Sequence, residues 1–283
     1  MRIRVDHLRR VLVTALSLTS MSCAVAAAAT THAGGAAAAP PLMVGHAHVP
    51  ASTVPPVIST GHHAVVVALG DSVPAGSACD CRNFVAGYAD LVSHRTHHTA
   101  AVTNLARGGA ETEDVLEQLK QPDVRRALDD ATTVLLMIGA NDFYRPFCHV
   151  QRGGSTTAAY RPVARQVQSN LEKTIRQIRA LHDGPVKIVV LGYWNVVEDG
   201  RVARRDYGAV GVAAAESATT WANRALKAAA RSADAVFVPT YEAFKGADGH
   251  KDPTSLLAAD GDHPNAAGHR VLARTVYAPL PTG

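Results

Sequence analysis

Five short runs rich in apolar, β-branched residues recur between residues 64 and 238 of this chain, and they limit its fold more than any other feature. They are residues 64–69, 101–105, 134–138, 186–191 and 235–238. Apolar residues dominate these runs without a regular alternation with polar ones, which is typical of parallel strands covered by helices on both faces. The runs therefore predict a mainly parallel sheet of five strands.

The stretches between these runs carry the period of amphipathic helices. Apolar residues from Val163 to Leu181 predict one long helix, with Pro162 in its first turn. Thr112 is the expected N-cap of another helix, a third covers residues 218–229, and the last opens near Pro264 and runs to about residue 277. Alternation of strand and helix predicts a three-layer α/β domain.

The N-terminus resembles a targeting segment. Four arginines within residues 1–10 precede an apolar run that ends in small residues, so residues 1–33 are expected to be a secretory signal peptide. Cleavage after Ala28 or after Ala33 fits equally well. The pair Arg9-Arg10 leaves a twin-arginine route open, and an uncleaved anchor is the third alternative. We therefore expect a secreted protein, either free or associated with the cell wall.

Residues 34–61 are rich in Ala, Pro, Thr and His without a period, which predicts a linker before a single domain over residues 62–283. Four Arg and one Asp fall within residues 1–33, so loss of this segment would lower the net charge from +4 to +1. This balance gives no general attraction to nucleic acid.

Three cysteines lie outside the signal segment, namely Cys79, Cys81 and Cys148. Disulfides persist in exported proteins. A bridge within Cys79-Asp80-Cys81 would close a small strained ring, so we expect one of these two to pair with Cys148, without a choice between them. A zinc site built on Cys79 and Cys81 is the alternative, although no fourth ligand is evident.

Gly70-Asp71-Ser72 follows the first apolar run directly. A tight turn after a buried strand would expose the Ser72 hydroxyl at the sheet edge, where it could act as a nucleophile. Ser72 could instead cap the following helix, or residues 70–77 could cradle a phosphate.

Asp260-Gly261-Asp262-His263-Pro264 supplies the partners that a serine nucleophile needs. His263 can take the serine proton and return it to the leaving alcohol. We expect Asp260 to be the carboxylate that orients the imidazole, because a residue three positions earlier can curl back to the ring. Asp262 is adjacent to His263, so its side chain is more easily directed away from the ring.

Donors for an oxyanion come from two further segments, each of which follows a predicted strand. We expect the Asn141 amide and the backbone N–H groups of Gly109 and Ser72 to form the oxyanion hole, with Gly108 as an alternative to Gly109. Asp142 is expected to be part of an ordinary turn. Tyr193 and Trp194 could line an acyl pocket or pack beneath a loop.

In this order, Gly70-Asp71-Ser72, Asn104 with Gly109, Gly139-Ala140-Asn141-Asp142 and the His263 segment resemble the motif blocks of the SGNH, or GDSL-type, hydrolase superfamily. The resemblance covers residues 64–277. It implies a flavodoxin-like α/β/α fold and metal-free hydrolysis of carboxylic esters without a cofactor. It assigns the name-giving roles to Ser72, Gly109, Asn141 and His263, with Asp260 completing the triad.

The sequence thus predicts a secreted serine esterase or lipase that works through an acyl-enzyme. A carbohydrate acetyl esterase of the same fold is one alternative, and a catalytically silent module that binds glycan or lipid is another. We expect a monomer that acts on a small-molecule, lipid or polysaccharide ester, with no nucleic-acid partner and no membrane span once the signal is removed.

Overall fold

The computed structural model describes residues 64–278 of the chain. The predicted signal peptide (1–33) and linker (34–61) lie outside the described residues, so both remain predictions. None of the helices within residues 64–278 combines the length and the apolar character needed to cross a bilayer.

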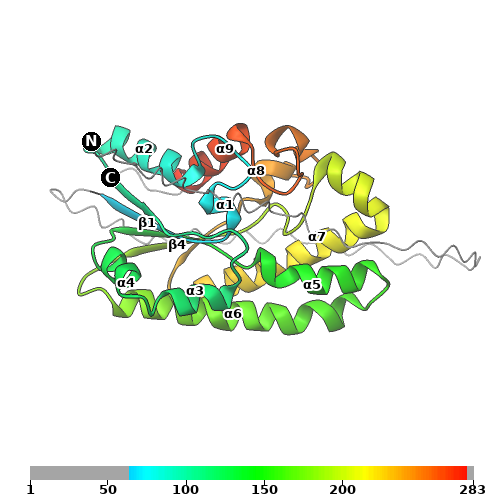
Figure 1. Ribbon diagram of the computed structural model, residues 1–283, viewed down its shortest axis with the longest axis horizontal. Coiled ribbons are helices and arrows are strands. Elements are labelled where there is room, and N and C mark those ends of the chain that lie inside the picture. The colour runs from blue at the N-terminus through cyan, green and yellow to red at the C-terminus, as the bar shows by residue number, and fades with distance from the viewer. Residues whose placement is uncertain (1–63, 279–283) are drawn as a thin grey trace, which may run out of the picture. The chain divides into compact units, whose positions relative to one another are not determined.

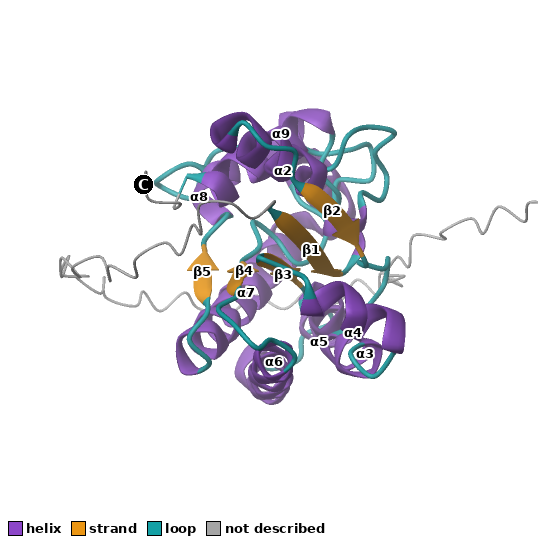
Figure 2. Ribbon diagram, turned by 90° about the vertical axis from the view of Figure 1, so that its left-hand side faces the viewer, coloured by secondary structure: helices purple, strands orange, loops and turns teal. Residues whose placement is uncertain are grey.

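A parallel sheet of five strands forms the centre of the described domain (Figure 2). The spatial order is β2-β1-β3-β4-β5, and every neighbouring pair is parallel. The strands are β1 (Val65–Gly70), β2 (Ala101–Asn104), β3 (Thr133–Met137), β4 (Lys187–Leu191) and β5 (Val236–Val238). All five predicted strands are confirmed. The edge strand β2 is exposed along its whole length, whereas the middle strands are buried.

Helices cover both faces of the sheet, which confirms the three-layer α/β/α prediction (Figure 2). On one face lie α2 (Phe84–Thr96), α8 (Tyr241–Lys245) and α9 (Ala266–Tyr277). The other face carries α3 (Thr112–Gln118), α4 (Pro122–Asp129), α5 (Ala140–Gln151), α6 (Thr156–Ala180) and α7 (Gly200–Ser232). The short α1 (Ser72–Ala75) lies just beyond the end of β1 in Figure 1, and a 3-10 helix, η1, spans Pro253–Leu256.

Two predicted helix starts are wrong. Glu111, not Thr112, is the N-cap of α3, and its N–H donates to the carboxylate of Asp114 at 2.8 Å. The Thr112 hydroxyl is instead engaged by Asp142. α6 begins at Thr156 after the cap Ser155, so Pro162 lies inside the helix rather than in its first turn.

Strand register brings the predicted site segments to one edge of the sheet. Gly70 at the end of β1 pairs with Met137 at the end of β3, while Ala68 of β1 pairs with Asn104 at the end of β2. The loops that follow these three strands therefore meet at their carboxyl ends, where open α/β sheets bind ligands.

Candidate active site

The turn after β1 can form only because residue 70 is glycine. Gly70 has a φ of +148°, and a Cβ there would lie 2.0 Å from the Met137 carbonyl oxygen of the neighbouring strand. Asp71 continues the turn with its N–H donating to the same oxygen at 3.1 Å, and its side chain caps the Val73 N–H at 3.0 Å. As a result the Asp71 side chain is buried, while Ser72 at the start of α1 remains partly exposed.

Tyr193, after β4, donates its phenol proton to the buried carboxylate of Asp71. Both side chains are only 1 % exposed. Burial raises the pKa of Asp71 to about 7, although the bonds from Tyr193 and from the Val73 N–H oppose this rise. Tyr193 thus supports the Ser72 turn from the buried side. This agrees with the alternative that Tyr193 packs beneath a loop rather than lining an acyl pocket. Trp194 is buried as well and stacks on Phe244, with ring centroids 4.1 Å apart.

The glycine loop after β2 lies against the Ser72 turn. The Arg107 N–H donates to the Gly70 carbonyl at 2.9 Å, and a Cβ on Gly108 would lie 4.0 Å from that of Ser72. Gly109 has a φ of +78°, and a Cβ on it would meet nothing within 4 Å. Gly108 therefore lies beside Ser72, and the open space around Gly109 leaves its backbone accessible.

Asn141 lies in the first turn of α5 and donates one amide proton to the Ala110 carbonyl at 2.8 Å. A primary amide carries two N–H donors, so this bond fixes the side chain and leaves the second donor for a ligand. The Asn141 amide is thereby held against the glycine loop.

Asp142 is more than a turn residue. Its carboxylate accepts from the hydroxyl of Thr112 at 2.6 Å and from the Thr112 N–H at 3.1 Å, and the Asn170 amide donates to the same hydroxyl. Burial raises the pKa of Asp142 to about 6. These bonds join the start of α3 to the start of α5, and no sequence pattern predicts them because the partners are 30 residues apart in the chain.

His263 is paired with Asp260. Its Nδ1 lies 2.8 Å from an Asp260 carboxylate oxygen and 3.9 Å from the nearest oxygen of Asp262. The second Asp260 oxygen accepts from the backbone N–H groups of Asp262 and His263 at 3.0 and 3.1 Å. This loop is closed by a bridge between Leu257 and Pro264.

The pair shifts both pKa values toward the charged forms. Burial opposes ionisation of Asp260, but the hydrogen bonds from the His263 ring and from the backbone outweigh burial and lower the Asp260 pKa. Burial likewise disfavours imidazolium at His263. The hydrogen bond to Asp260 and the negative charges of Asp262, Asp260 and Asp71 outweigh it, so the His263 pKa lies above 6.5.

Electrostatic interactions show that the loop that carries His263 lies near the Ser72 turn. Asp71, next to Ser72, interacts electrostatically with both Asp262 and His263. The structure thus gathers Ser72, the glycine loop, Asn141 and His263 at one edge of the sheet, with Asp260 behind the histidine.

A further acidic side chain near this edge was missed in the sequence. Glu198 is partly buried and lies close enough to Asp206 and Asp262 to interact with their charges. Burial, followed by these charges, raises its pKa to about 7. Glu198 lies in the loop before α7, and no recognisable sequence motif surrounds it. The sequence therefore could not predict it as a residue near the site.

The predicted pairing of Cys148 with Cys79 or Cys81 is wrong, because these two form a disulfide with each other. Their Cα atoms are 5.1 Å apart, within the range that a disulfide spans. The left-handed backbone of Ala78 (φ 57°) directly before Cys79 bends the loop tightly.

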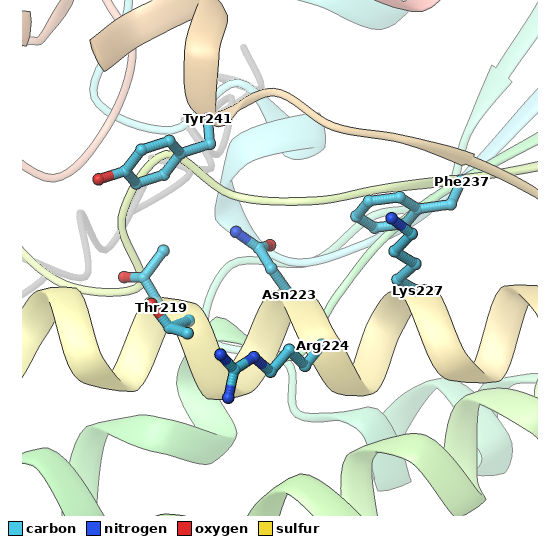
Figure 3. Close-up of a pocket in the computed structure, with 7 residues that line it drawn as sticks. Thr219, Asn223, Arg224, Lys227, Phe237 and Tyr241 are labelled. Carbon is cyan, nitrogen blue, oxygen red and sulfur yellow. The ribbon is translucent and has the colours of Figure 1, made fainter. Parts of the chain in front are cut away.

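A separate cavity of about 260 Å³ lies beside β5 (Figure 3). Its walls are Thr219, Thr220, Asn223, Arg224 and Lys227 of α7 with Phe237 and Tyr241. None of the predicted site residues lines it. Asn223 connects it indirectly to the active site, since its amide bonds the backbone N–H and carbonyl of Tyr193, each at 2.8 Å.

Solved structures of similar fold include several ester hydrolases. The lipase Lip_vut3 from a goat rumen metagenome aligns with a TM-score of 0.61 at 17% identity, over 76% of this chain and 96% of the lipase. The acetylxylan esterase Axe2 from Geobacillus stearothermophilus aligns with a TM-score of 0.55 at 19% identity, over 78% of this chain and 95% of Axe2. Among the Axe2 structures are catalytic mutants of a serine, an aspartate and a histidine, and that aspartate precedes that histidine by three positions.

Sequence comparison gives the family. The uncharacterized protein YpmR of Bacillus subtilis (strain 168) is 28% identical over 221 residues, which are 77% of this chain and 82% of YpmR. The model of the GDSL-like lipase/acylhydrolase family matches residues 68–271, which include every segment of the site described above. The chain therefore belongs to the GDSL-like lipase/acylhydrolase family and is a serine ester hydrolase.

Proposed function

We propose that the protein hydrolyses carboxylic esters through an acyl-enzyme on Ser72, with His263 and Asp260 completing a catalytic triad. The observation that carries this proposal is the 2.8 Å contact between His263 Nδ1 and Asp260, against 3.9 Å to Asp262. Because Asp260 occupies Nδ1, Nε2 is the nitrogen that exchanges protons with Ser72 and the substrate. The spacing of Asp260 and His263 equals that of the aspartate and histidine changed in the catalytic mutants of Axe2.

The reaction has two stages in this scheme. Ser72 Oγ attacks the ester carbonyl while His263 takes its proton, and the protonated ring then gives that proton to the leaving alcohol. Water attacks the acyl group in the second stage, again with His263 as the base, and the carboxylic acid leaves Ser72.

Negative charge on the carbonyl oxygen is stabilised by three donors in this account: the second amide proton of Asn141 and the N–H groups of Ser72 and Gly109. The bond from Asn141 to Ala110 fixes the amide before substrate arrives. Such preorganised donors need no rearrangement during the reaction, which is the main source of their effect.

Short acyl groups are the substrates that we favour. Within residues 64–278, only Val102 and Val210 are large hydrophobic side chains exposed to solvent, which argues against a broad lipid-docking surface. An acetylated carbohydrate is a specific candidate, since Axe2 shares the fold.

A panel of p-nitrophenyl esters from acetyl to palmitoyl, assayed beside acetylated xylan, tests this proposal. We expect the highest kcat/KM for acetyl or butyryl esters, and none of this activity in Ser72→Ala. A preference for palmitoyl would refute the short-acyl assignment. Binding of acetylated xylan without turnover of any ester would instead support a silent module.

We also propose that the protein is exported by the segment 1–33. The support is its four arginines, apolar run and small-residue end.

A further inference from the structure

A cluster of two sulfurs and one imidazole lies beside the active site and is not used by the proposed mechanism. The sulfurs of Cys79 and Cys81 and a ring nitrogen of His269 all lie within 4.8 Å of one another. Cys79 and Cys81 belong to the loop between α1 and α2, and His269 belongs to α9. Figure 2 shows α2 and α9 side by side on one face of the sheet.

His269 is held in one tautomer. Its Nδ1 accepts from the Phe84 N–H at 3.2 Å, so the proton of the neutral ring is on Nε2. Nε2 is buried and has no hydrogen-bond partner within residues 64–278, and the side chain is 99% buried. Burial lowers the His269 pKa to about 4, which keeps the ring neutral. A buried N–H donor without an acceptor destabilises the fold, so its retention needs an explanation.

The bonded form of the two cysteines does not suit a metal. Metal ligands are thiolates, and a disulfide offers none. The imidazole is also unsuitable, because a metal on Nε2 would require the Nδ1 proton that the contact with the Phe84 N–H excludes. The cluster fits a cysteine pair that opens and closes better than a metal centre.

The disulfide has the features of an exchangeable bond. Both cysteines are partly exposed, so a thiol can reach them. The bridge joins cysteines only two residues apart, so it restricts the unfolded chain less and stabilises the fold less than a bridge over a longer loop would. Exposed disulfides tend to be the labile ones.

We propose that Cys79 and Cys81 form a thiol–disulfide exchange site, in which the His269 Nε2–H stabilises the thiolate that is released. An external thiolate attacks one sulfur, the bond between Cys79 and Cys81 breaks, and the other cysteine leaves as a thiolate. A second external thiol then displaces the first cysteine, so that two external thiols become one disulfide and two protein thiols result. The partner that we infer is a low-molecular-weight thiol.

Opening this bond is expected to reach the active site, because the loop bridges its two halves. At one end, the Ser77 N–H donates to the Ser72 carbonyl at 2.9 Å. At the other end of the loop, the Phe84 N–H donates to His269 Nδ1. His269 is the fourth residue of α9, the helix that follows His263. The His263 charge also acts on His269. Loss of the bridge would relax the left-handed Ala78 and loosen the Ser72 turn.

Equilibration with glutathione buffers of graded redox ratio tests the site. After alkylation, peptide mapping measures the fraction of Cys79 and Cys81 that is reduced. We expect both cysteines to become reduced together and reversibly at millimolar glutathione while the protein stays folded. A pair that stays oxidised in the folded protein, and reacts only after denaturation, would overturn the proposal.

The role of His269 is tested by the pH profile of alkylation. In the reduced protein we expect one cysteine to react with a pKa below that of a free thiol. His269→Asn keeps an acceptor for the Phe84 N–H but removes the ring donor, so we expect alkylation at neutral pH to slow about three- to tenfold. His269→Gln, which places an amide donor near the Nε2 position, is the matched control and should keep the wild-type rate. Slower alkylation in His269→Gln, or a wild-type rate in His269→Asn, would refute this role.

Coupling to catalysis has its own readout. We expect kcat/KM for p-nitrophenyl acetate to fall about threefold or more as the pair is reduced, and to be insensitive to thiol in Cys79→Ser/Cys81→Ser. An unchanged kcat/KM would refute the coupling. Because mass mapping does not require ester hydrolysis, failure of the exchange site and failure of the proposed function are distinguishable.

Discussion

At the residue scale, the account depends on which carboxylate serves His263. Asp260 and Asp262 are chemically equivalent and flank the same glycine, but they differ in their distance from the ring. Asp262 lies 3.9 Å from Nδ1, too far for a hydrogen bond, so it acts on the ring through its charge alone. Asp260 both contacts the ring and accepts two backbone N–H groups.

Asp260→Asn should therefore lower kcat by about 10³–10⁴-fold, because an amide cannot hold the same tautomer or stabilise the imidazolium. In the wild type, kcat/KM should rise with pH as His263 loses its proton, with an apparent pKa above 6.5. This apparent pKa should fall in the variant. Asp262→Asn is the matched control and should lose less than about tenfold. Equal losses in the two variants would show that the assignment is wrong.

Asp71 predicts a pH dependence of stability. Its pKa is 3.8 in the unfolded chain and about 7 in the folded one, so between these values only the folded state holds the proton. The free energy of unfolding should therefore fall as pH rises through this window, by up to about 1.4 kcal/mol per pH unit from this group.

Asp71→Asn, which stays neutral, should flatten that slope in urea titrations between pH 4 and about 7. Part of the slope should remain, because the pKa values of Asp142 and Glu198 are raised as well. A variant with the full wild-type slope would contradict the shifted pKa of Asp71.

At the element scale, the end of β1 is the least tolerant point of the site. Gly70→Ala would place a Cβ 2.0 Å from the Met137 carbonyl oxygen and 2.9 Å from Pro74, so the turn could not form without moving β3. We expect it to lower the free energy of unfolding by at least about 3 kcal/mol. Gly184→Ala, where a Cβ meets nothing within 4 Å, is the control and should stay within about 0.5 kcal/mol. Similar melting temperatures for the two variants would argue against this geometry.

Sequence patterns predicted which strands and helices exist better than they predicted the residues at which these begin. All five strands arise from runs dominated by apolar residues, so they could be predicted, yet the exposure of the edge strand β2 could not. The start of α3 was predicted one residue late because the Thr112 hydroxyl is bonded to Asp142, 30 residues away. For α6, Pro162 suggested a first turn, but the cap at Ser155 extends the helix before it.

Contacts between segments that are distant in the chain could not be predicted from the sequence. The bond between Asp71 and Tyr193 joins residues 122 positions apart, and no local pattern marks such a partner. The Cys79–Cys81 bridge was predicted wrongly because its spacing suggested strain, whereas the left-handed Ala78 gives the loop its bend. In contrast, the pairing of His263 with Asp260 is local, and the geometry agrees with the preference stated from spacing.

At the scale of the whole molecule, the proposed export makes a prediction about the mature N-terminus. Protein recovered from the medium should begin after Ala28 or Ala33, with a net charge near +1 rather than +4. N-terminal sequencing of the secreted form distinguishes the two sites. A chain that retains residues 1–33 and stays with the cells would contradict cleavage and favour the anchor alternative.

The central claim is that one serine, at the end of one strand, carries the acyl group. Covalent labelling with a fluorophosphonate, followed by peptide mapping, tests it most directly. The account predicts a single adduct on Ser72, lost in Ser72→Ala and formed at least about 10²-fold more slowly in His263→Ala. An adduct on another residue, or ester hydrolysis that persists in Ser72→Ala, would contradict the account.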